Sequence, residues 1–167
     1  MRPTMSQLRK LVGVANYQFG SDAGMVLFTG RVHVTCSRRT GRMRHIYRNG
    51  KLVATLRPKD GYLALTPDGA EILLSRMTSP HNLVAVQGDV AEEVKKGGDA
   101  FAKHVVRADS RLRPAEEVII TDEQGQLLGV GRAVLSGTEM LYFKRGVAVK
   151  LRKGILESAK DQDPFSD

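Results

Sequence analysis

The sequence predicts an α+β protein built from two small domains, the second of them a mixed β-barrel. The length of 167 residues suits one domain or two small ones. The turn-forming stretch Ser79-Pro80-His81-Asn82 separates a half with both helical and strand patterns from a mainly β half. Short strand patterns at close spacing in that second half are typical of a small barrel. We therefore expect domains at residues 1–79 and 82–155, followed by a polar tail at 156–167.

The first half combines helical and strand signals. Apolar residues recur at intervals of three and four between Ser6 and Tyr17, which predicts an amphipathic helix with Ser6 at its N-cap. Residues 25–29 suit either a helical turn or a strand. Thr66 and Pro67 predict the start of a helix that runs to about Leu74. The strands expected in this half are residues 31–35, 42–47, 51–56 and 62–65, with a tight hairpin at Asn49-Gly50.

The second half is mainly β. One short helix is expected at residues 90–96, ended by Gly97-Gly98. No helix is expected after Leu135. Turns are expected at Arg113-Pro114 and over residues 122–125. The strands expected are residues 83–86, 100–106, 117–121, 127–135 and 147–151.

Charge is unevenly distributed along this basic chain, whose net charge is +8 and whose pI is about 9.9. Residues 1–79 hold 13 Lys and Arg against 4 Asp and Glu, and residues 31–59 hold nine basic residues and no acidic one. Such a segment suits phosphate contacts, because neutralising phosphates releases condensed counterions. The alternative is an ordinary solvated face. The candidate residues in this segment are Arg38, Arg39, Arg42 and Arg44, of which Arg42 and Arg44 are expected to share one strand face.

A second candidate surface lies in the other half. Lys95-Lys96-Gly97-Gly98 suits a helix C-cap, or a corner where a sugar-phosphate backbone comes close to glycine. The final strand carries Lys150, Arg152 and Lys153, which either protect an edge strand or contact RNA, and Arg132 is a weaker candidate for the same surface.

Several classes of chemistry have little support in the sequence. The lone Cys36 excludes an intramolecular disulfide and suits a reducing, cytoplasmic setting, and no membrane span or signal peptide is expected. The four histidines lack metal-ligand spacing, and neither a catalytic constellation nor a cofactor is expected. Residues 129–134 superficially resemble a dinucleotide fingerprint, which is rejected because no βαβ unit surrounds them. Tyr17 is left open between a core role and base stacking.

Several stretches occur in the order of a known pair of domains. They include Ala15-Asn-Tyr-Gln-Phe-Gly20, Thr40-Gly-Arg42, Lys95-Lys-Gly-Gly98, Leu128-Gly-Val-Gly-Arg-Ala133 and Gly146-Val-Ala-Val149. On these stretches, residues 83–154 resemble the PUA domain, named for pseudouridine synthases and archaeosine transglycosylases. Residues before Ser79 resemble the domain that precedes PUA in archaeal proteins, including the C-terminal part of archaeosine tRNA-guanine transglycosylases. That family's pattern has Asp where this chain has Asn16.

The resemblance implies an archaeal-type protein that binds structured RNA, either tRNA or rRNA, in RNA modification or in translation. In PUA domains the helix-to-strand corner matching Lys95 to Gly98 faces the RNA, beside the final strand. The catalytic aspartates and zinc ligands of transglycosylases lie on a barrel domain that this sequence lacks. The expected function is therefore non-catalytic RNA binding. The alternative is a docking subunit for a separate catalytic chain in a split tRNA-modifying enzyme.

Overall fold

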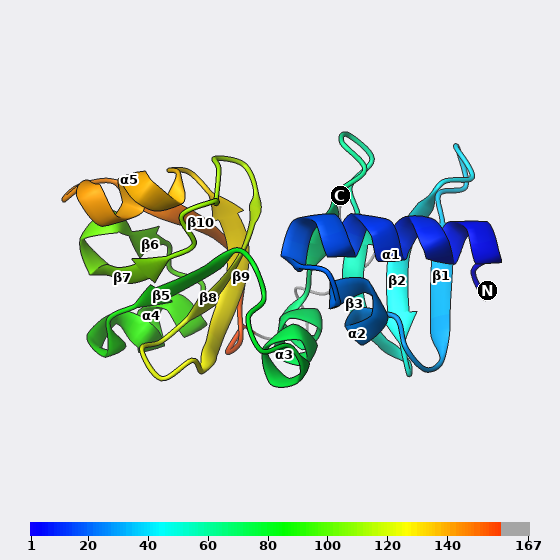
Figure 1. Ribbon diagram of the computed structural model, residues 1–167, viewed down its shortest axis with the longest axis horizontal. Coiled ribbons are helices and arrows are strands. Elements are labelled where there is room, and N and C mark those ends of the chain that lie inside the picture. The colour runs from blue at the N-terminus through cyan, green and yellow to red at the C-terminus, as the bar shows by residue number, and fades with distance from the viewer. Residues whose placement is uncertain (158–167) are drawn as a thin grey trace. The chain divides into compact units, whose positions relative to one another are not determined.

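The computed structural model describes residues 1–157 and divides the chain into two compact units, Met1–Leu83 and the part from Val84 onward. Figure 1 shows the helices and strands of both units. The prediction of a polar tail falls mainly on residues 158–167, which lie outside the described residues.

The first unit is an antiparallel four-stranded meander with helices on one side. The sheet order is β1-β2-β3-β4, and neighbouring strands in sequence are neighbours in space. Leu11 and Phe19 of the first helix are fully buried, as are Ile46 and Leu63 of the sheet, so the core lies between these layers. The elements are α1 (Met5–Phe19), α2 (Ala23–Leu27), β1 (Val32–Cys36), β2 (Met43–Arg48), β3 (Lys51–Leu56), β4 (Leu63–Leu65) and α3 (Pro67–Arg76).

Two local predictions in this unit are confirmed and one is wrong. Asn49 and Gly50 have φ of 51° and 83° and form the tight β2–β3 turn. The Thr66 hydroxyl accepts a hydrogen bond from Gly69 N–H at 3.2 Å and caps α3, which extends two residues past the expected end. Ser6 is not the cap of α1, because Thr4 and Gln7 form a reciprocal capping box that starts the helix earlier.

The second unit is a six-stranded sheet that curls into a barrel. Its strand order is β6-β10-β9-β8-β5-β7, so β6 and β7 are the edge strands. Only the three residues Ala102–His104 connect these two edges in the chain, which brings the edges together. The elements are β5 (Leu83–Val86), η1 (Gly88–Val90), α4 (Ala91–Lys95), β6 (Ala100–Phe101), η2 (Ala102–His104), β7 (Val105–Ala108), β8 (Glu117–Thr121), β9 (Leu127–Ala133), α5 (Gly137–Tyr142) and β10 (Val147–Gly154).

Two predictions for this unit need correction. The strand expected over residues 100–106 is broken by η2, because β6 pairs with β10 whereas β7 pairs with β5. A helix, α5, also follows β9, where none was expected. It begins with a capping box in which Ser136 Oγ accepts from Glu139 N–H at 3.2 Å and Glu139 Oε1 accepts from Ser136 N–H at 2.9 Å. With six residues α5 is too short to show a helical period in the sequence.

Candidate nucleic-acid interface

The meander of the first unit divides the basic segment between two ends of the sheet. Because the strands are antiparallel and consecutive, the β1–β2 and β3–β4 loops lie at the same end, as Figure 1 shows. We call these the 37–42 loop and the 57–62 loop. Arg31, Arg48 and Lys51 lie toward the opposite end, beside the β2–β3 turn. The basic residues at the two-loop end are Arg38, Arg39, Arg42, Arg44, Arg57 and Lys59.

Both loops have the same backbone hydrogen-bond pattern. In the 37–42 loop the N–H of Ser37 bonds to the carbonyl of Arg42 at 2.8 Å, and Gly41 N–H bonds to Ser37 at 2.8 Å. In the 57–62 loop the equivalent bonds join Arg57 to Tyr62 at 2.8 Å and Gly61 to Arg57 at 2.9 Å. Gly41 and Gly61 take positive φ, which an L side chain adopts only with strain. Each loop is therefore held by its own backbone.

The arginines of the 37–42 loop are available to a ligand. Arg38, Arg39 and Arg42 are exposed, and Arg44 is half-buried. The expectation that Arg42 and Arg44 share a strand face is not supported by the register. Arg42 precedes β2, and the pairing of Cys36 with Met43 and of Thr35 with His45 leaves Arg44 as an extra, bulged residue.

Two other polar residues of β2 are engaged inside the unit. Arg48 donates to the Val26 carbonyl at 2.8 Å and so connects the sheet to α2. Burial, and then the charge of Arg76, lowers the pKa of Arg48. His45 lies 3.0 Å from Thr35 Oγ1 through Nδ1, and burial, followed by the Arg44 charge, lowers the pKa of His45.

In the second unit, the glycines after α4 form a helix cap. Gly97 N–H bonds to the Val94 carbonyl at 3.0 Å and Gly98 N–H bonds to the Glu93 carbonyl at 2.9 Å, with Gly97 at a φ of 106°. This is the Schellman arrangement, so the structural interpretation of these glycines holds. Of the two lysines, Lys95 pairs with Glu92 at 3.0 Å, and Lys96 is exposed.

An acidic side chain occupies this corner. Glu157 Oε1 accepts a hydrogen bond from Gly154 N–H at 3.0 Å. The same oxygen lies 2.3 Å from the position of a Cβ on Gly97. The carboxylate thus occupies the space beside Gly97 into which the RNA-binding interpretation of the sequence brings a sugar-phosphate backbone.

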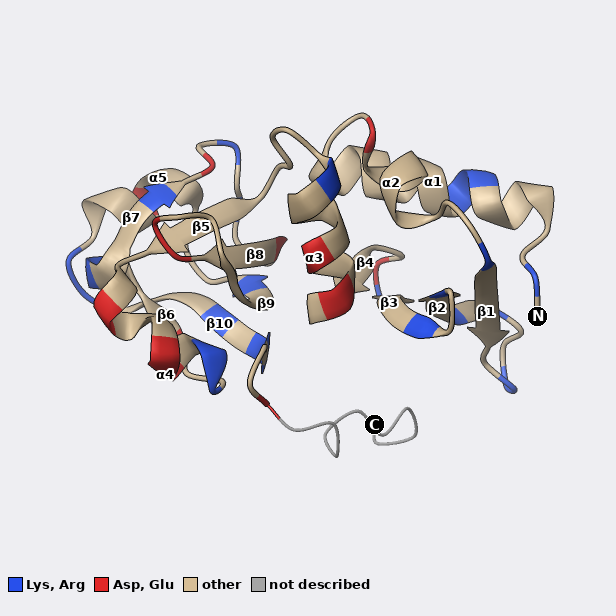
Figure 2. Ribbon diagram, turned by 90° about the horizontal axis from the view of Figure 1, so that it is seen from below, with Lys and Arg blue, Asp and Glu red and all other residues tan. Residues whose placement is uncertain are grey.

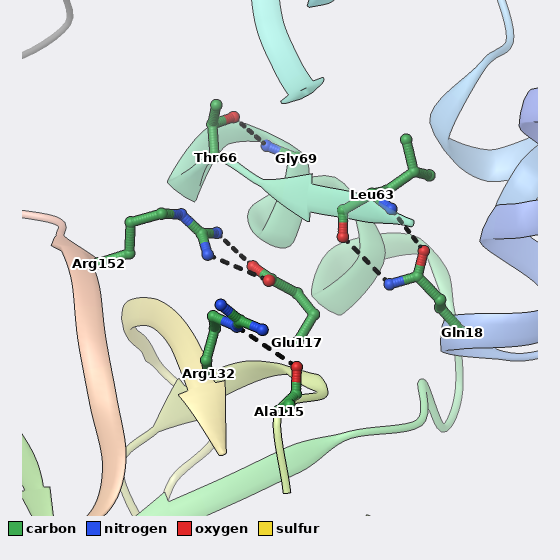
Figure 3. Close-up of polar contacts among 8 residues, drawn as sticks. All are labelled: Gln18, Leu63, Thr66, Gly69, Ala115, Glu117, Arg132 and Arg152. Carbon is green, nitrogen blue, oxygen red and sulfur yellow. Dashed lines mark hydrogen bonds and ion pairs between the residues drawn. The ribbon is translucent and has the colours of Figure 1, made fainter. Parts of the chain in front are cut away.

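Basic residues of β9 and β10 gather around one buried acid. Lys150 lies directly across from Arg132, which lies directly across from Glu117 of β8. Arg152 is the extra residue where the β9–β10 register shifts, and its guanidinium pairs with Glu117. Figure 3 shows this pair beside Arg132, whose Nε donates to the Ala115 carbonyl at 3.4 Å. The expected residues Arg132, Lys150 and Arg152 are therefore brought together, with Lys153 next along the strand, and Figure 2 shows the basic segments of β10.

No pattern in the sequence indicated the role of Glu117. It begins β8 directly before the apolar residues Val118 to Ile120, and its pairing with Arg152 joins positions 35 residues apart. A partner for a buried carboxylate at that separation is visible only once β8, β9 and β10 are placed side by side.

The glycines of the apparent dinucleotide fingerprint have a packing role. Gly131 lies within β9, between β8 and β10, and a Cβ there would lie 2.3 Å from the Lys150 carbonyl oxygen. The rejection of the fingerprint therefore holds, although a helix does follow this strand. Close approach of two strands accounts for the glycine.

Among residues 1–157, no group of three or more His, Cys, Asp and Glu residues could hold a metal ion. In the same part of the chain, no helix combines the length and apolar character needed to span a bilayer.

Comparison with known families accounts for both units. Residues 9–80 match the patch-forming domain C2 of tRNA-guanine transglycosylase, and residues 82–155 match the PUA domain. The chain therefore contains a C2-type domain followed by a PUA domain, and we call it the C2–PUA chain. This confirms the resemblance inferred from the sequence, with PUA as an RNA-binding domain.

The C2–PUA chain is similar to archaeal enzymes over part of their length. It is 40% identical over 151 residues to a tRNA-guanine(15) transglycosylase of Methanothermobacter thermautotrophicus, covering 90% of this chain and 23% of the relative. It is 39% identical over 155 residues to the enzyme of that name from Pyrococcus abyssi, covering 92% of this chain and 26% of the relative. The chain thus spans about a quarter of the length of the curated relatives it matches, at their C-terminal portion.

Solved structures support the fold of the C2–PUA chain. A hypothetical protein from Pyrococcus horikoshii superposes with a TM-score of 0.77 over 96% of each chain, at 19% identity. A conserved PUA domain protein from Thermoplasma acidophilum gives a TM-score of 0.63 over 87% of this chain and 86% of its own, at 20% identity. The predicted α+β class with a barrel-like second domain is confirmed.

Proposed function

We propose that the C2–PUA protein is a non-catalytic receptor for structured RNA. It binds the RNA mainly through contacts to the phosphate backbone. Residues 1–79 and 82–155 serve as its two binding modules. The observation that carries the proposal is the gathering of Arg38, Arg39 and Arg42 on one stiff, exposed loop, with a second basic loop beside it. In the PUA domain the contacts are assigned to Lys96, the Gly97-Gly98 corner, Arg132, Lys150 and Lys153, while Arg152 has a positioning role because it pairs with Glu117.

Backbone contacts suit double-helical RNA. The major groove of A-form RNA is too deep and narrow for side chains to read, so recognition depends on shape and on contacts to phosphates and 2′-hydroxyls. About five neutralised phosphates would give a log–log salt slope of about −4. We expect modest sequence specificity and strong dependence on salt.

The most suitable RNA class is tRNA. Support comes from the names of the relatives, which are tRNA-guanine(15) transglycosylases, and from the matched C2 domain of that enzyme class. In this proposal the C2 and PUA domains supply the RNA binding, and the chemistry for which the relatives are named is not assigned to them. The protein would act in the cytoplasm, where its single Cys36 stays reduced.

A salt titration of binding to total tRNA, with a DNA duplex of equal length as control, tests the proposal. The Arg38→Ala/Arg39→Ala variant should bind more weakly and reduce the salt slope by about 2. The matched control is Arg9→Ala/Lys10→Ala, which removes the same charge from exposed positions of α1. Weak binding that is equal for tRNA and DNA, or equal losses in both variants, would contradict the proposal.

An exposed apolar segment favours a second candidate function, docking to a catalytic chain. In the second unit Leu141, Tyr142 and Phe143 are 54%, 81% and 42% exposed, and Phe101, which pairs with Val147, is 44% exposed. Exposed apolar patches of this kind mark interaction sites. Sedimentation with a transglycosylase catalytic chain lacking its own C2 and PUA domains tests this function. Complex formation that Leu141→Ser/Tyr142→Ser abolishes would support it, and separate sedimentation would exclude it.

A further inference from the structure

Two tyrosine rings of the C2 domain form an exposed aromatic surface. The Tyr17 and Tyr62 rings stack with their centroids 6.0 Å apart and their planes inclined by 13°. The Tyr17 side chain is 76% exposed and that of Tyr62 is 38% exposed, so most of the Tyr17 ring remains in solvent. Phe19, two residues along α1, is fully buried. The core thus uses Phe19 and leaves a face of the tyrosine pair open.

A side-chain clamp fixes the position of these rings. The Gln18 side chain accepts a hydrogen bond from Leu63 N–H at 2.7 Å and donates one to the Leu63 carbonyl at 3.1 Å. It thereby satisfies both backbone groups of Leu63 on the edge strand β4, as Figure 3 shows. Tyr17 precedes Gln18, and Tyr62 precedes Leu63. The clamp therefore holds the end of α1 against the strand edge and sets the ring pair in place before any ligand arrives.

The ring pair adjoins a basic group with unused donors. Tyr62 closes the 57–62 loop, and the register that pairs Leu56 with Leu63 places Arg57 across from Tyr62. Arg57 Nη2 lies 3.2 Å from Asp60, whereas Nε and Nη1 are buried and have no hydrogen-bond partner among the described residues. Buried donors without acceptors are destabilising. Rotation of Arg57 outward, toward a phosphate, would remove that cost.

We propose that Tyr17, Tyr62 and Arg57 form a site for one unpaired nucleotide of an RNA. The base stacks on the open face of Tyr17, and the phosphate of that nucleotide accepts hydrogen bonds from the Arg57 guanidinium. Aromatic faces bind unstacked bases, whereas bases within a duplex already stack on each other. The site rests on the proposed function and narrows it, because the preferred RNA must present an unpaired base next to its helix. The exposed positive charge of the same loop, at Lys59, favours RNA over an apolar protein segment as the occupant.

Two RNAs of equal length test the site in the full chain. One is a hairpin whose loop carries a fluorescent adenine analogue, and the other is a blunt duplex without unpaired bases. Tyr17→Ala should weaken binding of the hairpin about tenfold and remove the quenching of the analogue by stacking. Tyr17→Phe, which keeps the ring, should restore both. The duplex affinity should stay within about twofold of the wild-type value, since its contacts are to phosphates.

The outcomes separate this site from the proposed function. Tight binding of both RNAs with no effect of Tyr17→Ala on the hairpin would overturn the nucleotide site and leave RNA binding intact. Equal losses for hairpin and duplex would overturn it as well, because the effect would then not depend on an unpaired base. Failure of the wild-type protein to bind either RNA would overturn the proposed function and the site together.

Discussion

The guanidinium of Arg152 on β10 pairs with the carboxylate of Glu117 on β8, and β9 lies between these two strands in the PUA sheet. Glu117 is fully buried and the Arg152 side chain is 35% exposed. Arg152 Nη1 lies 3.1 Å from Glu117 Oε2, and Nη2 contacts Oε1, so the pair is bidentate. The sequence leaves open two interpretations of the basic residues of the final strand, protection of an edge strand and RNA contact. Arg152, on a strand that lies between β6 and β9, instead pairs with a buried carboxylate, whereas its neighbour Lys150 stays a candidate RNA contact.

Removal of the arginine should destabilise the fold. Arg152→Ala removes a guanidinium that pairs with a buried carboxylate, which should lower the free energy of unfolding by about 3 kcal/mol. The measurement is urea denaturation, with Lys150→Ala as control, for which a change within about 0.5 kcal/mol is expected at an exposed strand position. The double variant Glu117→Gln/Arg152→Met should recover part of the lost free energy of unfolding, because it also removes the buried negative charge. Equal stability of Arg152→Ala and Lys150→Ala would contradict the role assigned to the pair.

Replacement of Asn16 by Asp, the residue that the family resemblance implies at this position, should be structurally neutral. Asn16 Oδ1 accepts a hydrogen bond from Gly24 N–H at 2.7 Å, at the start of α2. A Cβ on Gly24 would lie 2.6 Å from Val12, so α1 and α2 are in close contact and the bond sits at their junction. Asn16→Asp should retain the melting temperature, since a carboxylate oxygen accepts the same bond. Asn16→Ala should lower the free energy of unfolding by about 1 kcal/mol, because it removes the hydrogen bond. A loss with Asn16→Asp as large as that with Ala would show that the amide itself is needed.

Glu157 should weaken RNA binding in its present position. Its carboxylate occupies the corner beside Gly97. Glu157→Gln keeps an oxygen for Gly154 N–H and removes the charge that repels a phosphate, so tRNA affinity should rise about two- to fivefold. The control is Glu71→Gln, an exposed site on α3 of the first unit with the same charge change. An equal rise in both variants would mean that only net charge matters.

His45 should make the C2 domain less stable in mild acid. Burial, followed by the charge of Arg44, lowers the pKa of His45 from its ordinary value of 6.5. The neutral form is therefore favoured in the folded state, so its stabilising contribution is full above about pH 6.5 and is lost as the pH falls through the folded-state pKa. Denaturation midpoints measured between neutral and mildly acidic pH should fall, and His45→Gln should flatten that dependence. An unchanged profile in the variant would assign the effect to another group.

Signals that act within a few residues could be predicted from the sequence. The Asn49-Gly50 turn, the Thr66 cap with Pro67 and the Gly97-Gly98 cap are present because each depends on the φ angle or the hydrogen bond of adjacent residues. Where a prediction failed locally, a competing local signal was present. Thr4 with Gln7 displaced Ser6 as the cap of α1, and Ser136 with Glu139 started a helix too short to show periodicity.

The candidate RNA-binding residues were predictable as a set but not in their arrangement. Their charge and their family resemblance marked them in the sequence. Strand pairing then separated the basic segment between two ends of one sheet, and a bulge at Arg44 removed the regular alternation expected with Arg42. Which of these residues contact RNA stays a prediction.

Local sequence patterns were enough to predict the two-domain α+β class, the Asn49-Gly50 turn, the Thr66 cap and the Gly97-Gly98 cap. Three contacts became visible only in the folded chain: the pairing of Arg152 with Glu117, the position of Glu157 beside Gly97, and the Gln18 contact that holds Tyr17 beside Tyr62. The physical reason is the separation along the chain of the groups involved. Local preferences fix the backbone over a few residues, whereas ion pairs, edge clamps and ring stacks form only when folding brings distant strands and helices into contact.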